Sequence, residues 1–253
     1  MVERLRFRPK ARGILCVRPL WNALPIHRVF YTPSSERDVF VDRMDDPQAL
    51  MTVGRYAPHV VSMAGTNEKA LRTLLDDLEG GKEYRFHALD ARTADLVRQS
   101  FDVQSDNPSW FYTLERKDFV GDIGHEVSPL VPEDAETINE HWNPGEDSAR
   151  YIQSRIEKGL AFGMRVDGEL VAWDATHLET DRAIMVGLLH VMERFRKRGY
   201  ARSITTTMIN AVFEKGKTPI GHVFKDNEPS LRLTEEMGFR RRGEHTWMRA
   251  VSP

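Results

Sequence analysis

Residues 188–214 place an apolar strand, a strongly basic turn and a long helix in direct succession. The strand, Leu188 to Val191, leads into a turn that is rich in arginine and lysine. We predict that the helix after this turn runs from Gly199 to Glu214. A strand that passes directly into a helix is typical of folds in which helices cover a sheet, so we expect an α/β or α+β protein.

The basic turn has the features of an anion-binding site. The first N–H groups of a helix have no intrahelical acceptor, and the helix dipole adds partial positive charge at that end. Gly199 lets the backbone approach an anion closely, and Arg196, Lys197 and Arg198 add formal charge. A pyrophosphate is the expected guest. The alternative is a surface turn with solvated charges, and this segment alone does not decide between the two.

The second half of the chain reads as a sheet flanked by helices. Pro132 begins a helix that has acidic residues in its first turn, and Asn143-Pro144-Gly145 marks a loop. Asp167-Gly168 lies between two apolar runs and predicts a type I′ hairpin. The remaining helices are expected at about 148–158, 199–214 and 230–237, and the strands at 127–130, 161–166, 169–177, 183–191, 219–224 and 240–249.

The first half also alternates strands and helices. Thr66-Asn67-Glu68 begins a helix with leucines at helical spacing, and Gly80-Gly81 ends it. Lys117 to Gly124 is polar and is the expected linker, so we predict two domains, 1–120 and 125–253. Further helices are expected around 13–24 and 91–101, and strands at 39–41, 60–65, 84–88 and 110–114.

Composition excludes several classes of protein. The formal net charge of −2 does not favour a nucleic-acid surface, and a single cysteine, Cys16, excludes an intramolecular disulfide. No Cys/His grouping has zinc spacing, so no metal is expected. The chain has no apolar window of membrane-spanning length, and residues 1–10 lack the apolar stretch of a signal peptide, so neither a membrane span nor a signal peptide is expected. A cytoplasmic protein without a membrane or nucleic-acid partner is the expectation.

The basic turn, RKRGYA, resembles the Arg/Gln-x-x-Gly-x-Gly/Ala signature of the GNAT acyltransferase superfamily. The matching positions are Arg196, Gly199 and Ala201. The lead-in departs from the usual Val-x-Pro-Glu-x-Arg pattern, because Glu193 and Arg194 replace proline and glutamate. In that family the amides of this turn hold the pyrophosphate of coenzyme A. The resemblance therefore implies that the cofactor turn comprises Arg196, Lys197, Arg198, Gly199, Tyr200, Ala201 and Arg202.

A second segment, HVFKDNEPSLRLTEEMGF, resembles the family's Asn-x-x-Ser/Ala helix that ends in Gly-Phe. Its matching positions are Asn227, Ser230, Gly238 and Phe239. In relatives the asparagine and the start of this helix lie beside the pantetheine, so Asn227 and Ser230 are implied to bind the cofactor. A helix cap at Asn227 and a C-terminal cap at Gly238 are the structural alternatives.

The chain most resembles the glycine N-acyltransferase-like group, from about Val39 to Trp247. The matching positions in the second half are Trp142, Ser148, Tyr151, Ile152 and Trp173. This implies a tandem GNAT fold, with a mixed central sheet flanked by helices. The N-terminal half would be a degenerate GNAT-like domain that lacks the cofactor turn and shapes the acceptor side.

The resemblance also implies where the chemistry takes place. In GNAT folds two central strands splay apart, and strand amides, here near Leu189 and Val191, bind pantetheine and polarise the thioester. The glutamate base of glycine-acylating relatives aligns near Met185, which cannot take a proton. The candidate bases are His190, His222, Glu179 and Asp181, and each has the alternative of being a packed or solvated side chain.

The general acid of many relatives is a tyrosine whose position is Thr234 here. A threonine hydroxyl is a poor acid, so solvent is expected to protonate the thiolate. Ser230 is another hydroxyl nearby. The run Arg240 to Arg242 is either a solvated strand end or a contact for the adenosine 3′-phosphate.

The sequence thus predicts a GNAT-type acyl-CoA N-acyltransferase. It would transfer an acyl group, with acetyl-CoA as the first candidate, directly to a primary amine of a small molecule or amino acid. The alternatives are a protein or peptide N-acetyltransferase and an inert acyl-CoA-binding module. The sequence leaves the acceptor, the acyl length and the choice between monomer and homodimer open.

Overall fold

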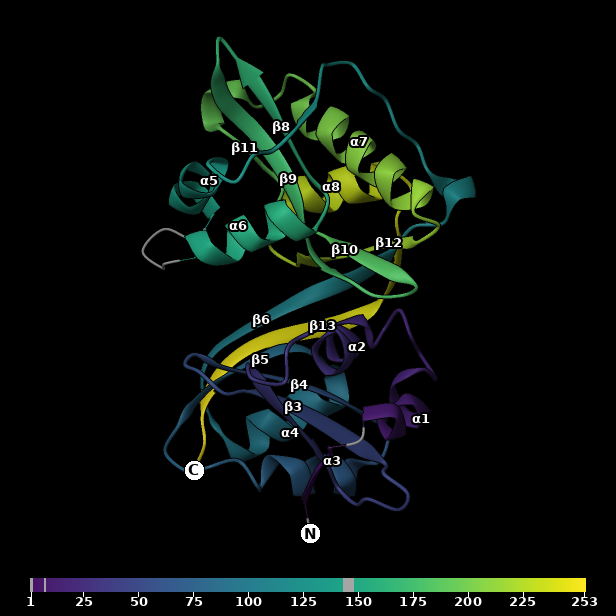
Figure 1. Ribbon diagram of the computed structural model, residues 1–253, viewed down its shortest axis with the longest axis vertical. Coiled ribbons are helices and arrows are strands. Elements are labelled where there is room, and N and C mark those ends of the chain that lie inside the picture. Colours follow the sequence, from purple (N-terminus) through teal and green to yellow (C-terminus); the bar gives the residue numbers. More distant parts are fainter. Residues whose placement is uncertain (1, 7, 143–147) are drawn as a thin grey trace. The chain divides into compact units, whose positions relative to one another are not determined.

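Two units, each built from strands with helices packed against them, make up the computed structural model (Figure 1). The described residues are 2–6, 8–142 and 148–253. The expected loop Asn143-Pro144-Gly145 lies outside these ranges. Unit 1 consists of Met1–Phe111, His222–Asn227 and Arg242–Pro253, and unit 2 of Tyr112–Gly221 and Glu228–Arg241.

The two units interleave along the sequence. The segments 222–227 and 242–253 come from the second half of the chain yet belong to unit 1, because strands β12 (Thr218–Phe224) and β13 (Arg240–Val251) contribute residues to both units. The assignment of whole domains to 1–120 and 125–253 stays a prediction.

The strands of unit 1 follow the order β1-β2-β3-β4-β5-β13-β6. β4 and β5 are parallel, whereas β1–β2, β2–β3, β3–β4 and β5–β13 are antiparallel. The elements of this unit are β1 (Glu3–Arg4), a 3-10 helix (Arg8–Ala11), α1 (Arg12–Leu15), α2 (Ala23–Phe30), β2 (Arg37–Val41), β3 (Ala49–Gly54), β4 (His59–Gly65), α3 (Glu68–Leu75), β5 (Glu83–Asp90), α4 (Ala91–Ser100) and β6 (Asp102–Thr113).

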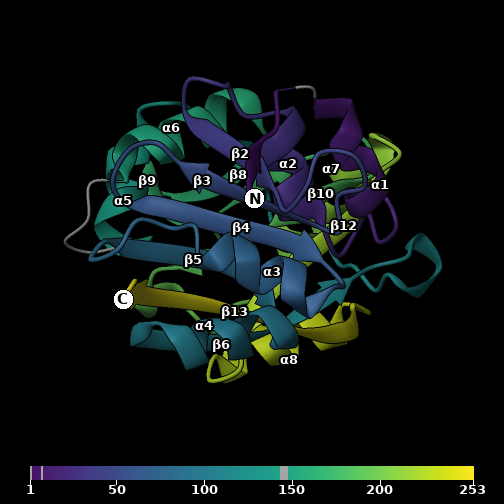
Figure 2. The ribbon, with the colours of Figure 1, turned by 90° about the horizontal axis from the view of Figure 1, so that it is seen from below.

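Two apolar cores cover the two faces of the unit 1 sheet. Figure 2 shows α3 and α4 on the near face of this sheet. On one face Leu71 and Leu74 of α3 pack with Phe86 of β5. On the other face Leu15 and Val29, from α1 and α2, pack with strand residues that include Leu50. α3 and α4 start at side-chain caps, where Asn67 accepts from the Ala70 amide and Asp90 from the Thr93 amide, as expected for helix N-termini.

The strands of unit 2 follow the order β12-β10-β9-β8-β7, and β11 pairs with β9. Only the β10–β12 pairing is parallel among the pairings given for the described residues of this unit. The elements are a 3-10 helix (Arg116–Asp118), β7 (Ser128–Pro129), α5 (Asp134–Trp142), α6 (Ala149–Lys158), β8 (Ala161–Val166), β9 (Glu169–Glu179), β10 (Ala183–Val186), β11 (His190–Val191), a second 3-10 helix (Glu193–Phe195), α7 (Tyr200–Glu214) and α8 (Glu228–Glu236).

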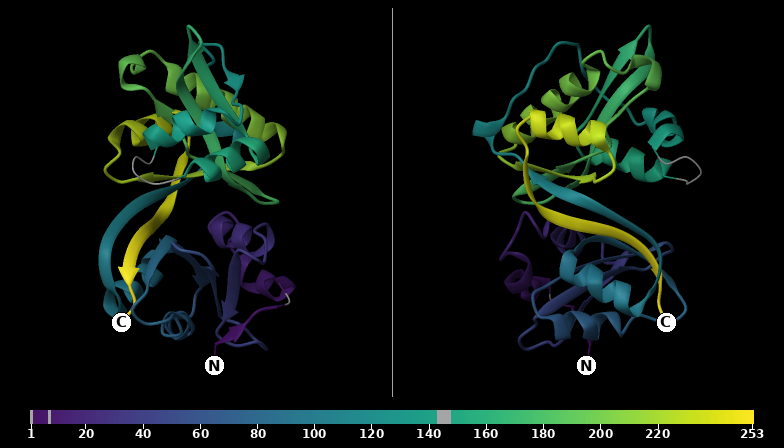
Figure 3. Two further views of the ribbon diagram at one scale, coloured as in Figure 1. Left: turned by 60° about the vertical axis from the view of Figure 1, so that its left-hand side comes forward. Right: turned by 180° about the vertical axis from the view of Figure 1, so that it is seen from behind.

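Helix α7 and the pair α5 and α6 lie on opposite sides of β8 and β9 (Figures 1 and 3). Successive strand residues point to opposite faces. Trp173 of β9 therefore packs with Ile138 and Ile152 of α5 and α6, whereas its neighbour Ala172 packs with Ile204 of α7. This alternation positions β9 as the central strand between the two helical layers.

Several expected elements are confirmed and others are wrong. The hairpin at Asp167-Gly168 has positive φ at both residues, 51° and 84°, as a type I′ turn requires. The expected helix at 13–24 is wrong, because the chain forms two short helices, α1 and α2, with turns between them. Strand β3 was not predicted. Its residues 49–54 are held between β2 and β4, so cross-strand pairing decides their conformation.

Candidate active site

The expected single strand at 183–191 is broken in the structure, and the break forms the centre of the candidate site. β10 pairs with β12 from Ala183 to Met185, and its register against β9 shifts between Met185 and Val186. The amides of Gly187 and Leu188 both donate to the Ala175 carbonyl, at 3.3 and 3.2 Å. Beyond this point, β11 pairs only with β9 among the described strands.

The break leaves one edge of β11 without a neighbouring strand in the described part of the chain. The amides of Leu188 and Met192 donate to β9. Successive backbone groups of a strand point to opposite edges, so the amides of Leu189 and Val191 lie on the edge away from β9. These are the two amides that the resemblance to the GNAT superfamily implied for the thioester, and that role stays a prediction.

The basic turn follows β11 after the short 3-10 helix Glu193–Phe195 and ends at the N-terminus of α7. Gly199 is the residue that precedes α7, with φ +85°, and Lys197 also has a positive φ of +62°. The first intrahelical bond runs from the Ser203 amide to the Gly199 carbonyl, at 3.1 Å. The amides of residues 200–202 precede this bond and therefore point out of the helix end.

Three cations of the turn lack a carboxylate partner. Among the described residues Arg196, Lys197 and Arg198 make no ion pair, and all three side chains are exposed. Arg196 Nε instead donates to the Val191 carbonyl at 3.1 Å. Arg202, by contrast, pairs with Glu236 at 2.7 Å. The helix end therefore combines outward amides with positive charge that has no ion-pair partner among the described residues, an arrangement that suits an anion.

A segment that sequence reasoning treated as a linker packs along α7 beside this turn. The amides of Asp122 and Gly124 donate to the hydroxyls of Thr206 and Ser203, at 3.1 and 3.2 Å. These contacts fix the chain next to the first turns of α7. These hydrogen bonds join hydroxyl side chains on α7 to backbone amides about 80 residues earlier in the sequence. Residue spacing does not predict such contacts.

The predicted bases lie in different surroundings. His190 is half-buried and stacks on Trp173 at 4.8 Å and on His141 at 5.6 Å. Burial, followed by the charges of His141 and Arg196, lowers the pKa of His190, so this imidazole is neutral at pH 7. It lies on β11, next to the strand edge described above.

Glu179 sits at the far end of β9 and is engaged by two lysines. Burial raises its pKa, but hydrogen bonds from Lys215, at 2.8 Å, and from Lys217 outweigh this and hold the pKa below its usual value. A carboxylate paired in this way is a weak proton acceptor. Asp181, in the turn that follows, is exposed.

His222 and Asn227 belong to unit 1, whereas Ser230 belongs to unit 2. His222 Nε2 lies 2.8 Å from Nδ1 of His245, and both rings lie near Phe111. Asn227 comes directly before α8, and its amide donates to the Phe224 carbonyl at 3.0 Å. Ser230 lies in the first turn of α8 and is half-buried. Their proposed roles toward a cofactor stay predictions.

Sequence reasoning missed Asp174, a carboxylate on the central strand β9. The residue is 1% exposed, and its Oδ1 has no hydrogen-bond partner among the described residues. Burial raises the pKa of Asp174 to about 7, although hydrogen bonds from the backbone of Ala175 and Gly187 act in the opposite direction. A polar residue within the apolar run Leu170 to Ala175 was the signal that could have found it.

His177 of β9 and Tyr151 of α6 were also missed as a pair. The Tyr151 hydroxyl lies 2.7 Å from His177 Nδ1. The His177 ring packs against Gly187, where a Cβ atom would lie only 3.0 Å from the imidazole. A side chain at residue 187 would therefore crowd the imidazole, and His177 contacts the strand break itself.

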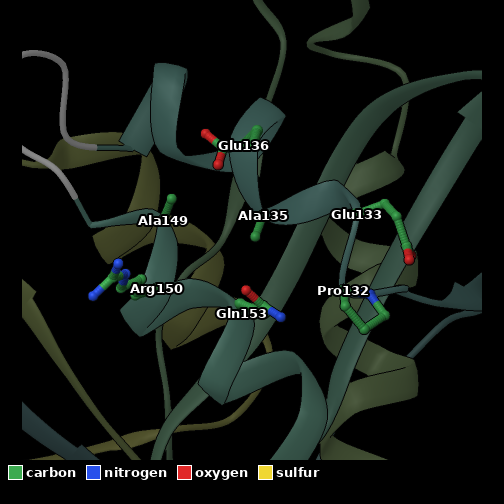
Figure 4. A pocket seen from close by; sticks show the side chains of 7 residues that line it. All are labelled: Pro132, Glu133, Ala135, Glu136, Ala149, Arg150 and Gln153. Atoms are coloured by element: carbon green, nitrogen blue, oxygen red, sulfur yellow. The ribbon is translucent and has the colours of Figure 1, made fainter.

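A hollow of about 270 Å³ lies between α5 and α6 (Figure 4). None of the residues that the sequence singled out for catalysis or cofactor binding lines it. Its lining residues are Pro132, Glu133, Ala135, Glu136, Ala149, Arg150 and Gln153.

The described residues contain no group of three or more His, Cys, Asp or Glu side chains arranged to hold a metal ion. They also contain no helix that is both long and apolar enough to cross a membrane.

Comparison with known proteins identifies the fold. Residues 161–248, which carry β8 to most of β13, match the FR47-like protein family. No curated protein matches the chain significantly.

Solved structures match the whole chain at low sequence identity. A Drosophila protein is 18% identical with a TM-score of 0.76, over 99% of this chain and 98% of its own. A putative acetyltransferase of the GNAT family from Novosphingobium aromaticivorans is 20% identical with a TM-score of 0.61, over 93% and 97%. A tandem GNAT protein from the clavulanic acid biosynthesis pathway is 11% identical with a TM-score of 0.62, over 100% and 99%. The expected tandem GNAT fold is confirmed, and the glycine N-acyltransferase-like subgroup stays a prediction.

Proposed function

We propose that the protein is an N-acyltransferase that takes its acyl group from an acyl-CoA, with acetyl-CoA as the first candidate. The observation that carries the proposal is the N-terminus of α7, where outward amides and three cations that have no carboxylate partner in the described part of the chain follow a broken strand. The match of residues 161–248 to the FR47-like family and the GNAT fold of the solved neighbours support it.

The residues present fit the chemical groups of coenzyme A. The amides of residues 200–202, with Arg196, Lys197 and Arg198, would hold the pyrophosphate. The amides of Leu189 and Val191, on the free edge of β11, would bind the pantetheine arm and donate to the thioester oxygen. Both groups of amides lie in unit 2. Five residues, 192–196, connect β11 to Lys197.

The transfer would be direct. The amine nitrogen forms a bond to the thioester carbon, the C–S bond breaks, and its electron pair remains on the sulfur of coenzyme A. One amine proton passes to a base, for which His190 is the candidate because it is neutral and lies on β11. Solvent protonates the thiolate, since Thr234 replaces the tyrosine of many relatives.

A catalytically inert acyl-CoA-binding module is the second candidate. The position at which glycine-acylating relatives carry their base is Met185, which is 3% exposed and is hydrogen-bonded between β9 and β12. A buried thioether has no proton to exchange. Under this alternative the α7 site would bind acyl-CoA but would not release thiol with any amine.

Calorimetric titration with coenzyme A and acetyl-CoA tests the binding site. Reversal of two charges, Arg196→Glu with Arg198→Glu, is expected to weaken binding at least 100-fold. The matched control is Lys69→Glu with Lys158→Glu. It changes the net charge by the same amount as the arginine pair, at two exposed lysines outside the basic turn. The proposal is wrong if the wild-type protein shows no association, or if the two double variants bind equally.

Thiol release from acetyl-CoA with a panel of amines tests the activity. The panel contains small amines, amino acids and peptides with a free N-terminus, so it separates small-molecule from peptide acceptors. Release that depends on the amine supports the transferase. Tight coenzyme A binding without release by any member of the panel would instead support the inert binding module.

A further inference from the structure

Trp173, His190 and His141 form a stack of three rings in unit 2. Between ring centroids, His190 lies 4.8 Å from Trp173, with 19° between the ring planes, and 5.6 Å from His141, with 22° between the planes. The His141 ring also lies 5.8 Å from Trp173. The three residues come from β9, β11 and α5, so the stack depends on the tertiary structure of this unit.

Strand pairing and helix spacing bring the three rings to one face of the sheet. His190 of β11 is the register partner of Trp173 on β9, and cross-strand partners project from the same face. Helix α5 covers that face, where Ile138 packs with Trp173. His141 follows Ile138 by three residues and therefore lies on the same side of α5. The histidine of the helix thus meets the histidine of the strand.

The two histidines differ in their contact with water. Trp173 is fully buried, His190 is half-buried and His141 is exposed. Removing a ring from water disfavours its charged form, so burial acts against a proton on His190. His141 lies in the last turn of α5, where the partial negative charge of the helix end favours a positive side chain. A proton taken up by the pair is therefore more stable on the outer ring, His141.

The short distance between the two histidines couples their protonation. Two imidazolium rings with centroids 5.6 Å apart repel each other, so a charge on His141 opposes a proton on His190. Burial, followed by the charges of His141 and Arg196, lowers the pKa of His190. From β9 the ring faces Trp173, which carries no charge but whose indole face by itself favours a cation. The neutral form of His190 therefore depends on the groups that oppose its protonation.

We infer that His141 is a positioning residue that keeps His190 in its neutral, proton-accepting form. His141 does not touch the reacting atoms and acts only through His190. In the proposed reaction the amine proton passes to a ring nitrogen of His190 and from there to water, which restores the neutral ring. This inference rests on the proposed function, in which His190 is the base, and adds the residue that controls its protonation.

Nuclear magnetic resonance titration of the histidine rings in the full-length protein tests this control without substrate. The His190 signal is identified by its absence in His190→Gln. In His141→Gln the midpoint of the His190 titration should move to higher pH, because one opposing charge is removed. His141→Lys keeps a positive charge at the end of α5, so its midpoint should stay close to that of the wild type.

Two further variants show whether the titration is sensitive and specific. Arg196→Gln removes the other charge that acts on His190 and should move the midpoint in the same direction as His141→Gln. His59→Gln is the matched control, since it removes a histidine of unit 1, and it should leave the midpoint unchanged. Melting temperatures of all variants show whether a change reflects unfolding.

The pH dependence of turnover links the stack to the reaction. The measurement uses the best amine of the panel and saturating acetyl-CoA. The ratio of kcat/KM at pH 8.5 to kcat/KM at pH 6 should be about 2–5-fold larger in His141→Gln than in the wild type, because more of His190 is protonated at pH 6. His141→Lys should restore the wild-type ratio. A merely structural role of His141 would lower kcat/KM equally at both pH values.

The outcomes separate this inference from the proposed function. Equal His190 midpoints in the wild type and His141→Gln overturn the inference, whether or not the protein is active. A shifted midpoint with an unchanged ratio of kcat/KM also overturns it, because His190 is then not the base. If the midpoint shifts in His141→Gln but no amine reacts, the proposed function fails while the control of His190 by His141 stands.

Discussion

His125 Nε2 lies 2.8 Å from the carbonyl oxygen of Arg198. Arg198 is the last residue before Gly199, so this bond holds the basic turn one residue before α7 begins. The His125 ring also packs edge-on against Tyr200 at 4.7 Å. A side chain from the segment before β7 therefore fixes the backbone whose amides we assign to the pyrophosphate.

The first prediction concerns this bond. His125→Ala should raise the Kd for coenzyme A about 2–10-fold, because one neutral hydrogen bond that orders the turn is lost. Titration calorimetry measures the change. The control is His59→Ala, which removes a comparable bond to the Gly54 carbonyl at 3.0 Å within unit 1. Equal affinities of the two variants would show that His125 does not order the turn.

The second prediction concerns Gly199. Its φ of +85° is unfavourable for a β-branched residue, and a Cβ would lie 3.4 Å from His125 Nε2. Gly199→Val should lower stability by about 1–3 kcal/mol and weaken coenzyme A binding at least 10-fold. Gly168→Val is the control, since Gly168 has φ +84° with no atom within 4 Å of its Cβ position. It should lose similar stability and keep full affinity.

The third prediction concerns the buried carboxyl of Asp174. The folded protein holds its proton up to about pH 7, whereas the unfolded chain loses it near the ordinary value. Stability therefore falls as pH rises between these values, by about 4 kcal/mol in total. Asp174→Asn should remove this loss. Its melting temperature should equal that of the wild type near pH 4 and exceed it increasingly up to pH 8.

A matched variant keeps the Asp174 prediction specific. Asp95→Asn changes a carboxylate on the surface of α4 that is exposed, and it should not reproduce the rise with pH. If the melting temperatures of Asp174→Asn and the wild type differ by the same amount at pH 4 and at pH 8, the carboxyl of Asp174 does not have the raised pKa.

The fourth prediction concerns acid stability at His177. Its pKa is lowered to about 4 in the folded protein, so the unfolded chain binds a proton first as pH falls below about 6.5. Stability is fully present above this value and is lost between about pH 6.5 and 4, by roughly 3 kcal/mol. His177→Asn should show a smaller loss of unfolding free energy in denaturant at pH 4.5 relative to pH 7.5. Equal losses in His177→Asn and the wild type would show that His177 does not carry the lowered pKa.

The local sequence determined most of the elements that carry the proposed cofactor site. The apolar run before the basic turn predicts a strand that ends at Val191, and the helical spacing after Gly199 predicts α7 within one residue. The type I′ hairpin at Asp167-Gly168 followed from residue types alone. These features depend on neighbouring residues, and residue preferences for φ and helix caps act at that range.

The tertiary structure decided the parts that depend on pairing and burial. The strand predicted at 183–191 is broken after Val186, because β12 pairs with β10 only up to Ile220 and β9 changes register at the same place. β3 is a strand through its two neighbours rather than through its own pattern. Pairing partners are distant in sequence, so local patterns do not specify where pairing stops.

The same reason explains the site residues that the sequence did not identify. Asp174 is unusual because it is buried, and Tyr151 because its hydroxyl meets His177, 26 residues further along the chain. Residue type and spacing indicate which chemistry a side chain can supply. Which groups it faces, and whether water reaches it, depend on packing between elements, and this alone sets the protonation state and direction of each bond.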